Sequence, residues 1–559
     1  MAREDAAVAP RNTAGGGQFD ADGEMAAALT EWTALKKAAE QDLAAHAPSG
    51  LKIGARLILG GAIALVAANL GFLLFDLNHK SYGDGPILAM TERMRSEPIS
   101  RDWLREPPYT LSCYGPAFYY VTNGLTRLGG WQHSLVPGRI VALVSALLAA
   151  ALAAIAAGRQ TKSVELGLLA ALIFMVSAPF SEWVPHARVD MLAIAFAAAA
   201  YMAVGPRTRG AVIAAFCIAA GSLAKPTVAL SAAPICAHLL ATRRYRDAGI
   251  FCLLVSALGA AAWGAVEWAS NGFFLTAVLS GNRNPMAAWR GYFFLYQFLC
   301  CPLGAVAVLC SAQLLISSPK RFFGSLYSLG FVVSLAISVV TICKQGSELN
   351  YFLEPALLGA IAIAVDGFPR LCMPGPRRGL AAIAILAAVL GMPYLREVKH
   401  QYLSPAKQPK AYAMVKDYLA GEPDDVQLLA DGRIVDMVLA AGRRPWLNDS
   451  YLYMLLVDNG TLDPAPLLDR LRDGRIKWLF FRKDLSDHLE SSTRYGNCWP
   501  MQVIDALPRY YELVEKRNGL WVYRHRSYQA AAVRRVEDGA DRRSSCEAAK
   551  CLFFLAAAR

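Results

Sequence analysis

Residues 53–75 read IGARLILGGAIALVAANLGFLLF, an apolar run long enough to cross the ~30 Å hydrocarbon core of a bilayer as one helix. It is the first of eleven apolar stretches, and together they predict a mainly α-helical, polytopic membrane protein. Several stretches are shorter than the ~20 residues of a straight span, so the number of spans is open by one or two. The other ten are 138–157, 164–181, 189–204, 210–223, 227–241, 247–268, 296–316, 324–342, 351–366 and 379–394.

Composition and charge agree with this prediction. Of the 559 residues, 55% are hydrophobic and 18% are charged, whereas soluble proteins have about 25% charged residues. If the N-terminus is inside, every predicted inner loop is basic, as the positive-inside rule requires. The net charge of +12 therefore reflects topology and not a nucleic-acid surface. The basic residues of these loops are Arg159, Lys162, Arg207, Arg209, Arg243, Arg244, Arg246, Lys320, Arg321, Arg370, Arg377 and Arg378.

The chain divides into four segments by composition: a cytoplasmic, disordered N-terminal extension (1–50), a transmembrane domain (51–395), an extracytoplasmic α/β domain (396–526) and a flexible tail (527–559). The extension lacks the charged start, apolar core and cleavage site of a signal peptide. The α/β domain is expected to be a lid or docking surface over the membrane part, or purely structural. Its short strands are expected at 426–430, 478–481 and 519–524, alternating with helices at 412–420, 432–441 and 464–473.

The first outer loop, 76–137, contains an acid between two glycines. Gly83 and Gly85 free the backbone around Asp84, so its carboxylate can be directed at something other than bulk water. The loop is also rich in aromatic residues, among them Tyr82 and Tyr114. The alternative is a solvated type I turn, for which Asp is a common first residue.

A lysine is predicted at membrane depth. Residues 211–223 span only ~20 Å as a helix, which is too short to cross the bilayer. The chain then turns at Lys225-Pro226-Thr227 and returns to an inner loop, so Lys225 lies at the tip of a hairpin near the outer edge. A cation at this depth is costly without an anionic partner. Two interpretations remain: Lys225 extends to the headgroups, or it binds the phosphate of a lipid-linked substrate.

Three more polar clusters fall on the same, outer side of the membrane. His186 and Asp190 are four residues apart and would share a helical face, with Arg188 pointing away, although Asp190 could simply cap the helix. Glu354 falls within an apolar register and therefore needs a partner or a water-lined cavity. The remaining candidates for substrate binding are Lys344, Asn350 and Arg283.

These segments, in this order, resemble the GT-C class of membrane glycosyltransferases, especially bacterial relatives of family 39 and of the aminoarabinose and protein O-mannosyl transferases. The resemblance covers about 53–395, and the outer α/β domain is similar to the C-terminal domain of many relatives. One departure is that the family often has a double acid where Asp84 is followed by Gly85, which weakens the case for a carboxylate pair that binds a metal. The matching motifs are Asp84, Tyr114-Gly115-Pro116, Arg188-Val189-Asp190, Lys225-Pro226-Thr227 and Asn350-Tyr351-Phe352-Leu353-Glu354.

The resemblance implies an inverting transfer of a sugar from a polyprenyl-phosphate donor to an acceptor hydroxyl at the outer face of a bacterial cytoplasmic membrane. Asp84 is the expected general base and Lys225 the expected phosphate contact, supported by Lys344 or Arg188. Asp190 and Glu354 are expected to orient these cations. Tyr82, Tyr114 and Trp103 could stack on the sugar or the isoprenoid. No cofactor is assigned, and a divalent metal is left open.

Two other classes of function remain compatible with the sequence. A transporter or lipid flippase would also bury charges between helices, but it would usually show repeated halves with interrupted spans, and no internal repeat is found. A non-catalytic envelope-assembly protein would use the outer domain for partners and would not need Lys225 at depth. The sugar, and the acceptor among glycolipids, glycans and proteins, cannot be predicted from spacing.

Overall fold

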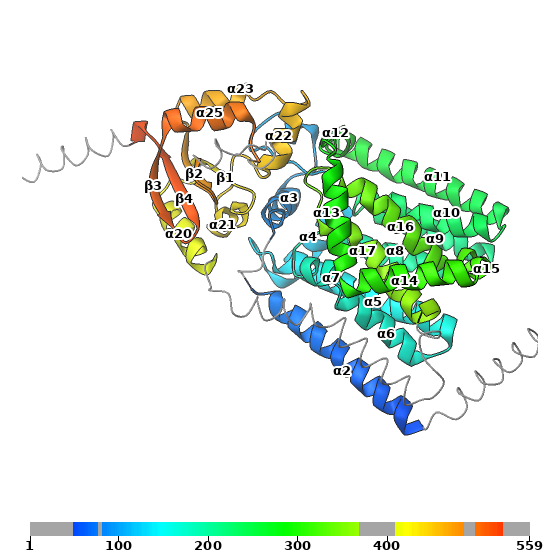
Figure 1. Cartoon of the computed structure of the whole chain (residues 1–559). Coiled ribbons are helices and arrows are strands. Elements are labelled where there is room, and N and C mark those ends of the chain that lie inside the picture. Colours follow the sequence, from blue (N-terminus) through cyan, green and yellow to red (C-terminus); the bar gives the residue numbers. More distant parts are fainter. Residues whose placement is uncertain (1–48, 77–80, 368–407, 486–497, 529–559) are drawn as a thin grey trace, which may run out of the picture.

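The computed structural model describes residues 49–76, 81–367, 408–485 and 498–528. Figure 1 shows a large helical part, from α2 to η4, and a smaller part with a β-sheet, from α20 to β4. The predicted fold class, a mainly α-helical polytopic membrane protein with a small C-terminal α/β domain, is confirmed. The predicted N-terminal extension up to residue 48, the apolar stretch 379–394 and the tail from residue 529 lie outside the described residues.

Ten of the eleven predicted apolar stretches coincide with helices in the described residues. The bounds of the helical part are α2 (Ser49–Leu73), α3 (Asp84–Ser96), η1 (Arg101–Leu104), α4 (Ala117–Gly129), α5 (Val136–Thr161), α6 (Val164–Met175), α7 (Ala178–Trp183), α8 (Asp190–Ala203), α9 (Thr208–Ser222), η2 (Pro226–Ser231), α10 (Ala232–Ala241), α11 (Tyr245–Ala269), α12 (Phe273–Ser280), α13 (Ala288–Cys300), α14 (Pro302–Ser317), α15 (Pro319–Gly324), α16 (Leu326–Ile342), η3 (Leu349–Phe352), α17 (Leu353–Ala362) and the π-helical turn η4 (Ile363–Gly367).

Within the described residues, four helices are long and apolar enough to cross a membrane: Ile53–Leu73, Val136–Thr161, Tyr245–Ala269 and Leu349–Gly367. The predicted stretch 296–316 is not straight, because α13 and α14 meet at Cys301-Pro302 with a bend of 89°. Proline cannot donate the backbone hydrogen bond that would continue the helix. The stretch 164–181 is likewise divided between α6 and α7. The chain is a multi-pass membrane protein whose helices are more often broken than the apolar pattern predicts.

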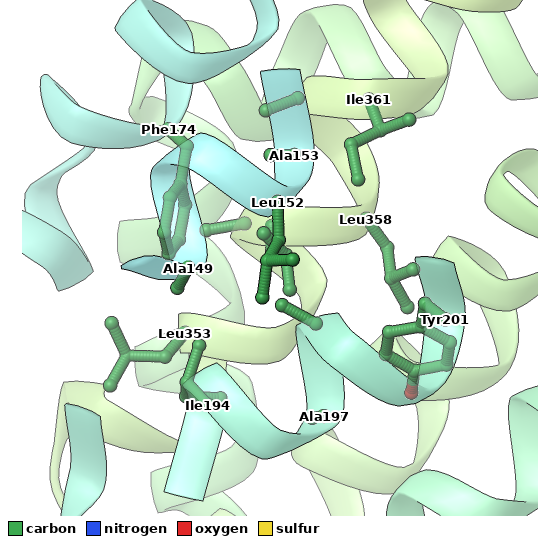
Figure 2. Packing of buried hydrophobic residues seen from close by; sticks show 14 of the residues in the cluster. Ala149, Leu152, Ala153, Phe174, Ile194, Ala197, Tyr201, Leu353, Leu358 and Ile361 are labelled. Carbon is green, nitrogen blue, oxygen red and sulfur yellow. The ribbon is translucent and has the colours of Figure 1, made fainter. Parts of the chain in front are cut away.

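The core of the helical part lies where α5, α6, α8 and α17 meet. Figure 2 shows small residues of α5 and α8, including Ala149, Ala153 and Ala197, between larger side chains such as Phe174 and Leu358. Small residues allow helix backbones to approach closely, which favours packing inside a bilayer where apolar burial gives little driving force. This packing brings α8 and α17 together, and the N-terminal ends of both helices carry predicted site residues, Asp190 and Glu354.

The C-terminal part is a sheet of order β1-β2-β4-β3 with helices on both faces. β1 pairs with β2 in parallel, and the other neighbours are antiparallel. Alternate residues of β2 face opposite layers: Leu479 packs with α22, α23 and α25, and Phe480 with α20 and α21. The bounds are α20 (Gln408–Ala420), β1 (Gln427–Ala430), α21 (Val435–Ala440), α22 (Ser450–Asp458), α23 (Ala465–Arg472), β2 (Ile476–Phe481), α25 (Met501–Tyr510), β3 (Tyr511–Arg517) and β4 (Leu520–His525).

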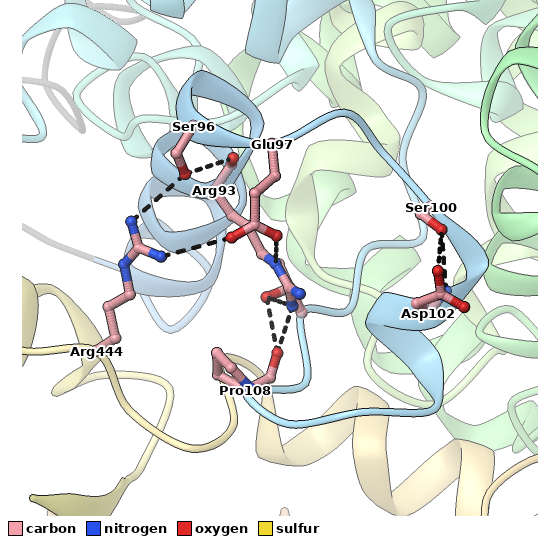
Figure 3. Close-up of polar contacts among 8 residues, drawn as sticks. Arg93, Ser96, Glu97, Ser100, Asp102, Pro108 and Arg444 are labelled. Carbon is pink, nitrogen blue, oxygen red and sulfur yellow. Dashed lines mark hydrogen bonds and ion pairs between the residues drawn. The ribbon is translucent and has the colours of Figure 1, made fainter. Parts of the chain in front are cut away.

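The α/β part contacts the first outer loop through helix α3. Gly85 of α3 lies against the backbone of Gly432 and Asp436, where a larger side chain would not fit. At the rim, Arg444 reaches Glu97 at 3.9 Å and the Ser96 hydroxyl at 3.5 Å, as Figure 3 shows. These rim contacts are exposed and therefore contribute little to stability. The close backbone approach, and not the ion pair, indicates that the two parts are packed together.

Candidate active site

Asp84 does not lie in a solvated turn. It is the first residue of α3, and its side chain is fully buried. Oδ2 accepts a hydrogen bond from the Ser81 backbone N–H at 2.9 Å, and Oδ1 accepts one from the Ser81 hydroxyl at 3.1 Å. The His186 Nδ1 lies 3.3 Å from Oδ2. The carboxylate is therefore directed into the protein, as predicted, but its position depends on partners that the loop sequence does not reveal.

The surroundings of Asp84 favour its ionised form. Burial alone would raise the pKa of Asp84, but the charges of His186 and Arg139 and the hydrogen bonds to His186 and the Ser81 backbone hold it well below its usual range. Arg139 is itself buried and donates to the backbone oxygens of Leu73 and Asp76, so it also fixes the end of the first span. Asp84 consequently carries a negative charge at neutral pH.

Arg188 connects Asp84 to the next cluster. The prediction that His186 and Asp190 share a helical face is wrong, because α8 begins only at Asp190. His186 turns toward Asp84, whereas the Arg188 Nε lies 3.6 Å from Asp190 Oδ2. Gly83 lies directly under the Arg188 guanidinium, so any side chain at position 83 would overlap it. The glycine is required for this close approach, since its φ of −82° is ordinary for other residues.

Lys225 has the anionic partner that its depth requires. It lies in the turn between α9 and η2, and its Nζ donates to Asp190 Oδ1 at 2.6 Å. The same oxygen accepts from Asn350 Nδ2 at 2.7 Å. The Lys225 Nζ also lies 4.7 Å from the centre of the Tyr351 ring, a cation–π contact. Lys225 and Asn350, from distant parts of the sequence, thus converge on one carboxylate. We call Arg188, Asp190, Lys225 and Asn350 the cation cluster.

A cleft opens beside the cation cluster. Its empty volume is about 530 Å³, including space open to solvent. The Asn350 Oδ1 atom is buried without a hydrogen-bond partner among the described residues, so a ligand hydroxyl or a water could donate to it. The cleft is bordered by Asp190, Lys225, Asn350, Glu354, Thr227, Tyr351, Ser334, Ser338 and Thr341, and by apolar side chains of α8, η2, α16 and α17.

Glu354 has hydroxyl partners in place of a cation. Its carboxylate accepts hydrogen bonds from the Tyr201 hydroxyl and from the Ser231 hydroxyl, the latter at 2.6 Å. Among the residues that the structure describes, no basic side chain forms an ion pair with Glu354. The expectation that Glu354 orients a cation is therefore not met there. Tyr201 and Ser231 were not predicted, because nothing in their sequence context distinguishes them from other small or aromatic residues of a span.

Two predicted basic residues lie at the edge of the site. Lys344 donates to the Asn282 side-chain oxygen at 2.7 Å, so an amide and not a carboxylate holds it. The turn of Asn282 and the loop of Lys344 are neighbours, since Met286 and Lys344 form a β-bridge. Arg283, in the same turn, is exposed, and no described contact joins its side chain to the cation cluster.

The predicted aromatic residues have three different environments. The Tyr114 hydroxyl accepts from Arg188 Nη2 at 3.0 Å, so this ring borders the cation cluster. The Tyr82 hydroxyl is bonded to Asp449 at 3.0 Å, in the C-terminal part. Trp103 is buried against Phe273 and under Arg93, and it has no surface on which a sugar could stack. The prediction for Trp103 is therefore wrong. Trp183, which was not predicted, packs against His186 and Arg188.

Neither a bond between Cys113 and Cys498 nor a metal site among the described residues adds to this geometry. Cys113 and Cys498 are both free thiols. Among the described residues, no group of three or more His, Cys, Asp or Glu side chains is arranged to hold a metal ion.

Comparison with solved structures identifies the fold. ArnT from Cupriavidus metallidurans bound to undecaprenyl phosphate aligns with 82% of this chain and 97% of its own, with a TM-score of 0.55 and 12% identity. AglB, an archaeal oligosaccharyltransferase from Archaeoglobus fulgidus in complex with an inhibitory peptide and a dolichol-phosphate, aligns with 82% of this chain and 72% of its own, with a TM-score of 0.53 and 12% identity. The chain has the GT-C fold. No family model and no curated protein matches the sequence.

Proposed function

We propose that the protein is an integral membrane glycosyltransferase that moves a sugar from a polyprenyl-phosphate donor to an acceptor hydroxyl on the outer face of the membrane, with inversion. The observation that carries the proposal is the cation cluster beside the cleft, in a fold similar to that of ArnT bound to undecaprenyl phosphate. The acceptor class, whether glycolipid, glycan or protein, follows from neither observation.

The charge of the cation cluster suits a phosphate. Arg188 and Lys225 carry two positive charges and Asp190 one negative charge, so one positive charge remains. An isolated cation at membrane depth would be costly, and the ion pair with Asp190 holds Lys225 in place before a ligand arrives. A phosphate would add a second anionic partner to both cations. Lys344 lies at the edge of the site and would support the phosphate from there.

The reaction is a single displacement. The acceptor oxygen forms a bond to the anomeric carbon, and the bond from that carbon to the phosphate oxygen breaks with its electron pair. Attack from the opposite face inverts the configuration. The acceptor proton passes to a base, and the products are a glycoside and polyprenyl phosphate. The cation cluster stabilises the negative charge that builds on the departing phosphate, which is usually the larger contribution to catalysis.

Asp84 is the proposed general base. Its lowered pKa makes it a weak base at neutral pH, so its contribution would lie toward the lower end of the 10²–10⁴-fold typical of such groups. A second candidate is His186, whose Nδ1 lies 3.3 Å from Asp84 Oδ2 and which would take the proton while Asp84 orients the imidazole. If Asp84 is the base, kcat should stay constant as the pH falls to about 4. An acid limb between pH 5 and 8 would indicate a histidine instead.

The domain arrangement proposed here has residues 1–50 in the cytoplasm, 51–395 in the membrane and 396–526 outside, followed by the tail 527–559. The membrane would be the cytoplasmic membrane of a bacterium, with the site facing the periplasm or the exterior. The helical part then anchors the lipid donor, and the outer surface receives the acceptor.

The test uses purified full-length protein in lipid nanodiscs. Undecaprenyl phosphate is the probe for donor binding, and membranes with radiolabelled polyprenyl-phosphate sugars report transfer. Lys225→Met should weaken undecaprenyl phosphate binding at least tenfold, because one charged hydrogen bond is worth about 1.5–3 kcal/mol. Lys320→Met, in the predicted inner loop, is the matched control. Equal binding by the two variants would remove Lys225 from the phosphate site, and transfer by Asp84→Asn at the wild-type rate would remove Asp84 as the base.

A further inference from the structure

One short segment of the C-terminal part contacts the membrane part at three separate places. The anchor segment, Asn448–Tyr451, precedes and begins helix α22. Asp449 caps this helix by accepting from the Leu452 backbone N–H, so the direction of the segment is fixed from within its own domain. A segment held in this way can in turn hold other parts of the chain.

The first contact is with the residues on both sides of Asp84. The Tyr82 hydroxyl donates to Asp449 Oδ1 at 3.0 Å, lies 3.1 Å from the Ser450 hydroxyl and accepts from the Tyr451 backbone N–H at 2.9 Å. Asn448 Nδ2 donates to the backbone oxygen of Pro86 at 3.3 Å. Asp84 therefore lies between two residues that the C-terminal part holds.

The second contact is with the strand-like segment before Tyr114. Asn448 Oδ1 accepts from the Leu111 backbone N–H at 2.7 Å, and Asn448 Nδ2 donates to the Leu111 oxygen at 3.0 Å. Asn448 is buried, so these bonds form away from water. A buried amide that satisfies both backbone groups of one residue fixes that residue's position closely. Tyr114, which accepts from Arg188, follows three residues later.

The third contact is with the loops that carry Lys344. The Tyr451 hydroxyl accepts from Asn284 Nδ2 at 3.1 Å. The Tyr451 ring also covers Gly346, which has a φ of +80° and no room for a side chain. Asn284 and Gly346 are each two residues from Asn282 and Lys344, which are bonded to each other. Tyr451 thus contacts both the turn that carries Asn282 and the loop that carries Lys344.

We propose that the anchor segment is a positioning element of the active site, through which the C-terminal domain sets the distance between Asp84 on one side and Lys344 on the other. The active-site role rests on the proposed function. The claim that the anchor segment holds the loops does not depend on it. The anchor segment lies outside the cation cluster, so its loss should change the alignment of the reacting groups more than it changes phosphate binding. Misalignment of about 1 Å can lower a rate about 100-fold.

The variants are Tyr82→Phe and Tyr451→Phe, which each remove one hydroxyl and keep the ring. Tyr418→Phe is the matched control, because its hydroxyl bonds to Glu515 at 2.7 Å within the C-terminal domain. Hydrogen exchange of the full-length protein in nanodiscs, without substrate, is the first measurement. Tyr82→Phe should speed exchange at the Tyr451 amide up to about tenfold, since the lost bond protects that amide. Tyr451→Phe should speed exchange in 282–286 and 344–348.

Turnover is the second measurement. Tyr82→Phe should lower kcat by about 10- to 100-fold while KM for the donor stays within about twofold of wild type. Exchange in either variant that matches Tyr418→Phe would overturn the proposal. Faster exchange with unchanged kcat would overturn the active-site role and leave only domain docking. If wild type itself transfers no sugar, the proposed function fails, and the exchange data still decide whether the anchor segment holds the loops.

Discussion

Three consecutive residues of the first outer loop contact three separate parts of the molecule. Tyr82 bonds to Asp449 in the C-terminal part, Gly83 lies under Arg188, and Asp84 pairs with His186. These contacts decide which residue fits each position. Position 82 needs a hydroxyl, position 83 needs the absence of a side chain, and position 84 needs a carboxylate. The sequence pattern indicated that Asp84 was directed at something, but it could not supply the partners, which lie about 100 or more residues away.

Replacing Asp84 by Asn should affect stability in a pH-dependent way. The folded-state pKa of Asp84 is lowered, so its carboxylate stabilises the fold above the unfolded-state pKa of about 3.9 and loses that effect as the pH falls. At pH 7 the substitution should cost up to about 3–5 kcal/mol, because it removes a buried negative charge that faces His186 and Arg139. The difference in Tm from wild type should shrink below about pH 4. Asp102→Asn, an exposed carboxylate of the same loop visible in Figure 3, should shift Tm little at any pH.

Asp190 and Asp366 offer a matched pair of buried carboxylates in the membrane part. Asp190 holds Lys225. Asp366 accepts from the hydroxyls of Ser325 and Ser328 at 2.6 and 2.7 Å, and its Oδ1 lies 3.7 Å from Arg321 Nη2. Asp190→Asn and Asp366→Asn should both lower Tm. Both variants keep Arg188 and Lys225, so undecaprenyl phosphate should raise Tm in both. The rise should be larger in Asp190→Asn, since there the phosphate also replaces the missing negative charge. Equal recovery in both variants would argue against a phosphate at the cation cluster.

At the scale of elements, the sequence predicted which segments are helices and the turn at Lys225-Pro226-Thr227, but not the bend at Cys301-Pro302. The bend at Cys301-Pro302 and the turn η2 depend on single prolines within otherwise apolar runs. In the C-terminal part, β1, β2 and β4 were predicted, and β3, α22 and α25 were missed. Strand β3 is an edge strand whose charged residues, Glu512 and the run 515–517, do not alternate with apolar ones, and α22 is apolar on most sides. Neither segment therefore shows a clear period.

Helix α13 has the features of a helix that lies along the membrane surface. Its exposed residues Trp289, Tyr292, Phe293 and Tyr296 follow helical spacing, and it meets α14 at nearly a right angle. Aromatic side chains of this kind concentrate where the bilayer meets water. Its first turn is joined to the site, because the Ala287 N–H donates to the Cys343 oxygen at 2.7 Å.

The position of α13 can be measured by quenching with brominated lipids. The difference in fluorescence between wild type and Trp289→Phe isolates the signal of Trp289. Lipids brominated near the headgroup should quench this signal more than lipids brominated near the end of the acyl chain. Trp478→Phe is the control, because Trp478 is buried in the C-terminal part and should report no quenching. Stronger quenching by the deep bromines would instead mean that α13 enters the bilayer.

At the scale of the whole molecule, two groups of polar contacts among the described residues correspond to the two predicted sides of the membrane. One group contains the cation cluster, Asp84 and the anchor segment. The other joins predicted inner loops: Arg56 pairs with Glu165 at 2.8 Å, and Arg244 donates to the Gly205 oxygen at 2.7 Å. The sequence predicts the side of the membrane for each loop, because that side depends only on the order of spans and charges. The distances within each side depend on packing among helices and could not be predicted.

The orientation of these two groups relative to the membrane gives the last prediction. Alkaline phosphatase needs disulfides and is active only outside the cytoplasm, whereas green fluorescent protein folds inside. Phosphatase fused after Gly130 or after residue 526 should be active, and phosphatase fused after Lys162 inactive, because the basic loop at Lys162 is retained inside. The fluorescent fusions should give the reverse pattern and serve as controls for expression. An active phosphatase after Lys162 would place the cation cluster on the cytoplasmic side, where the donor would have to be reached from the inner leaflet.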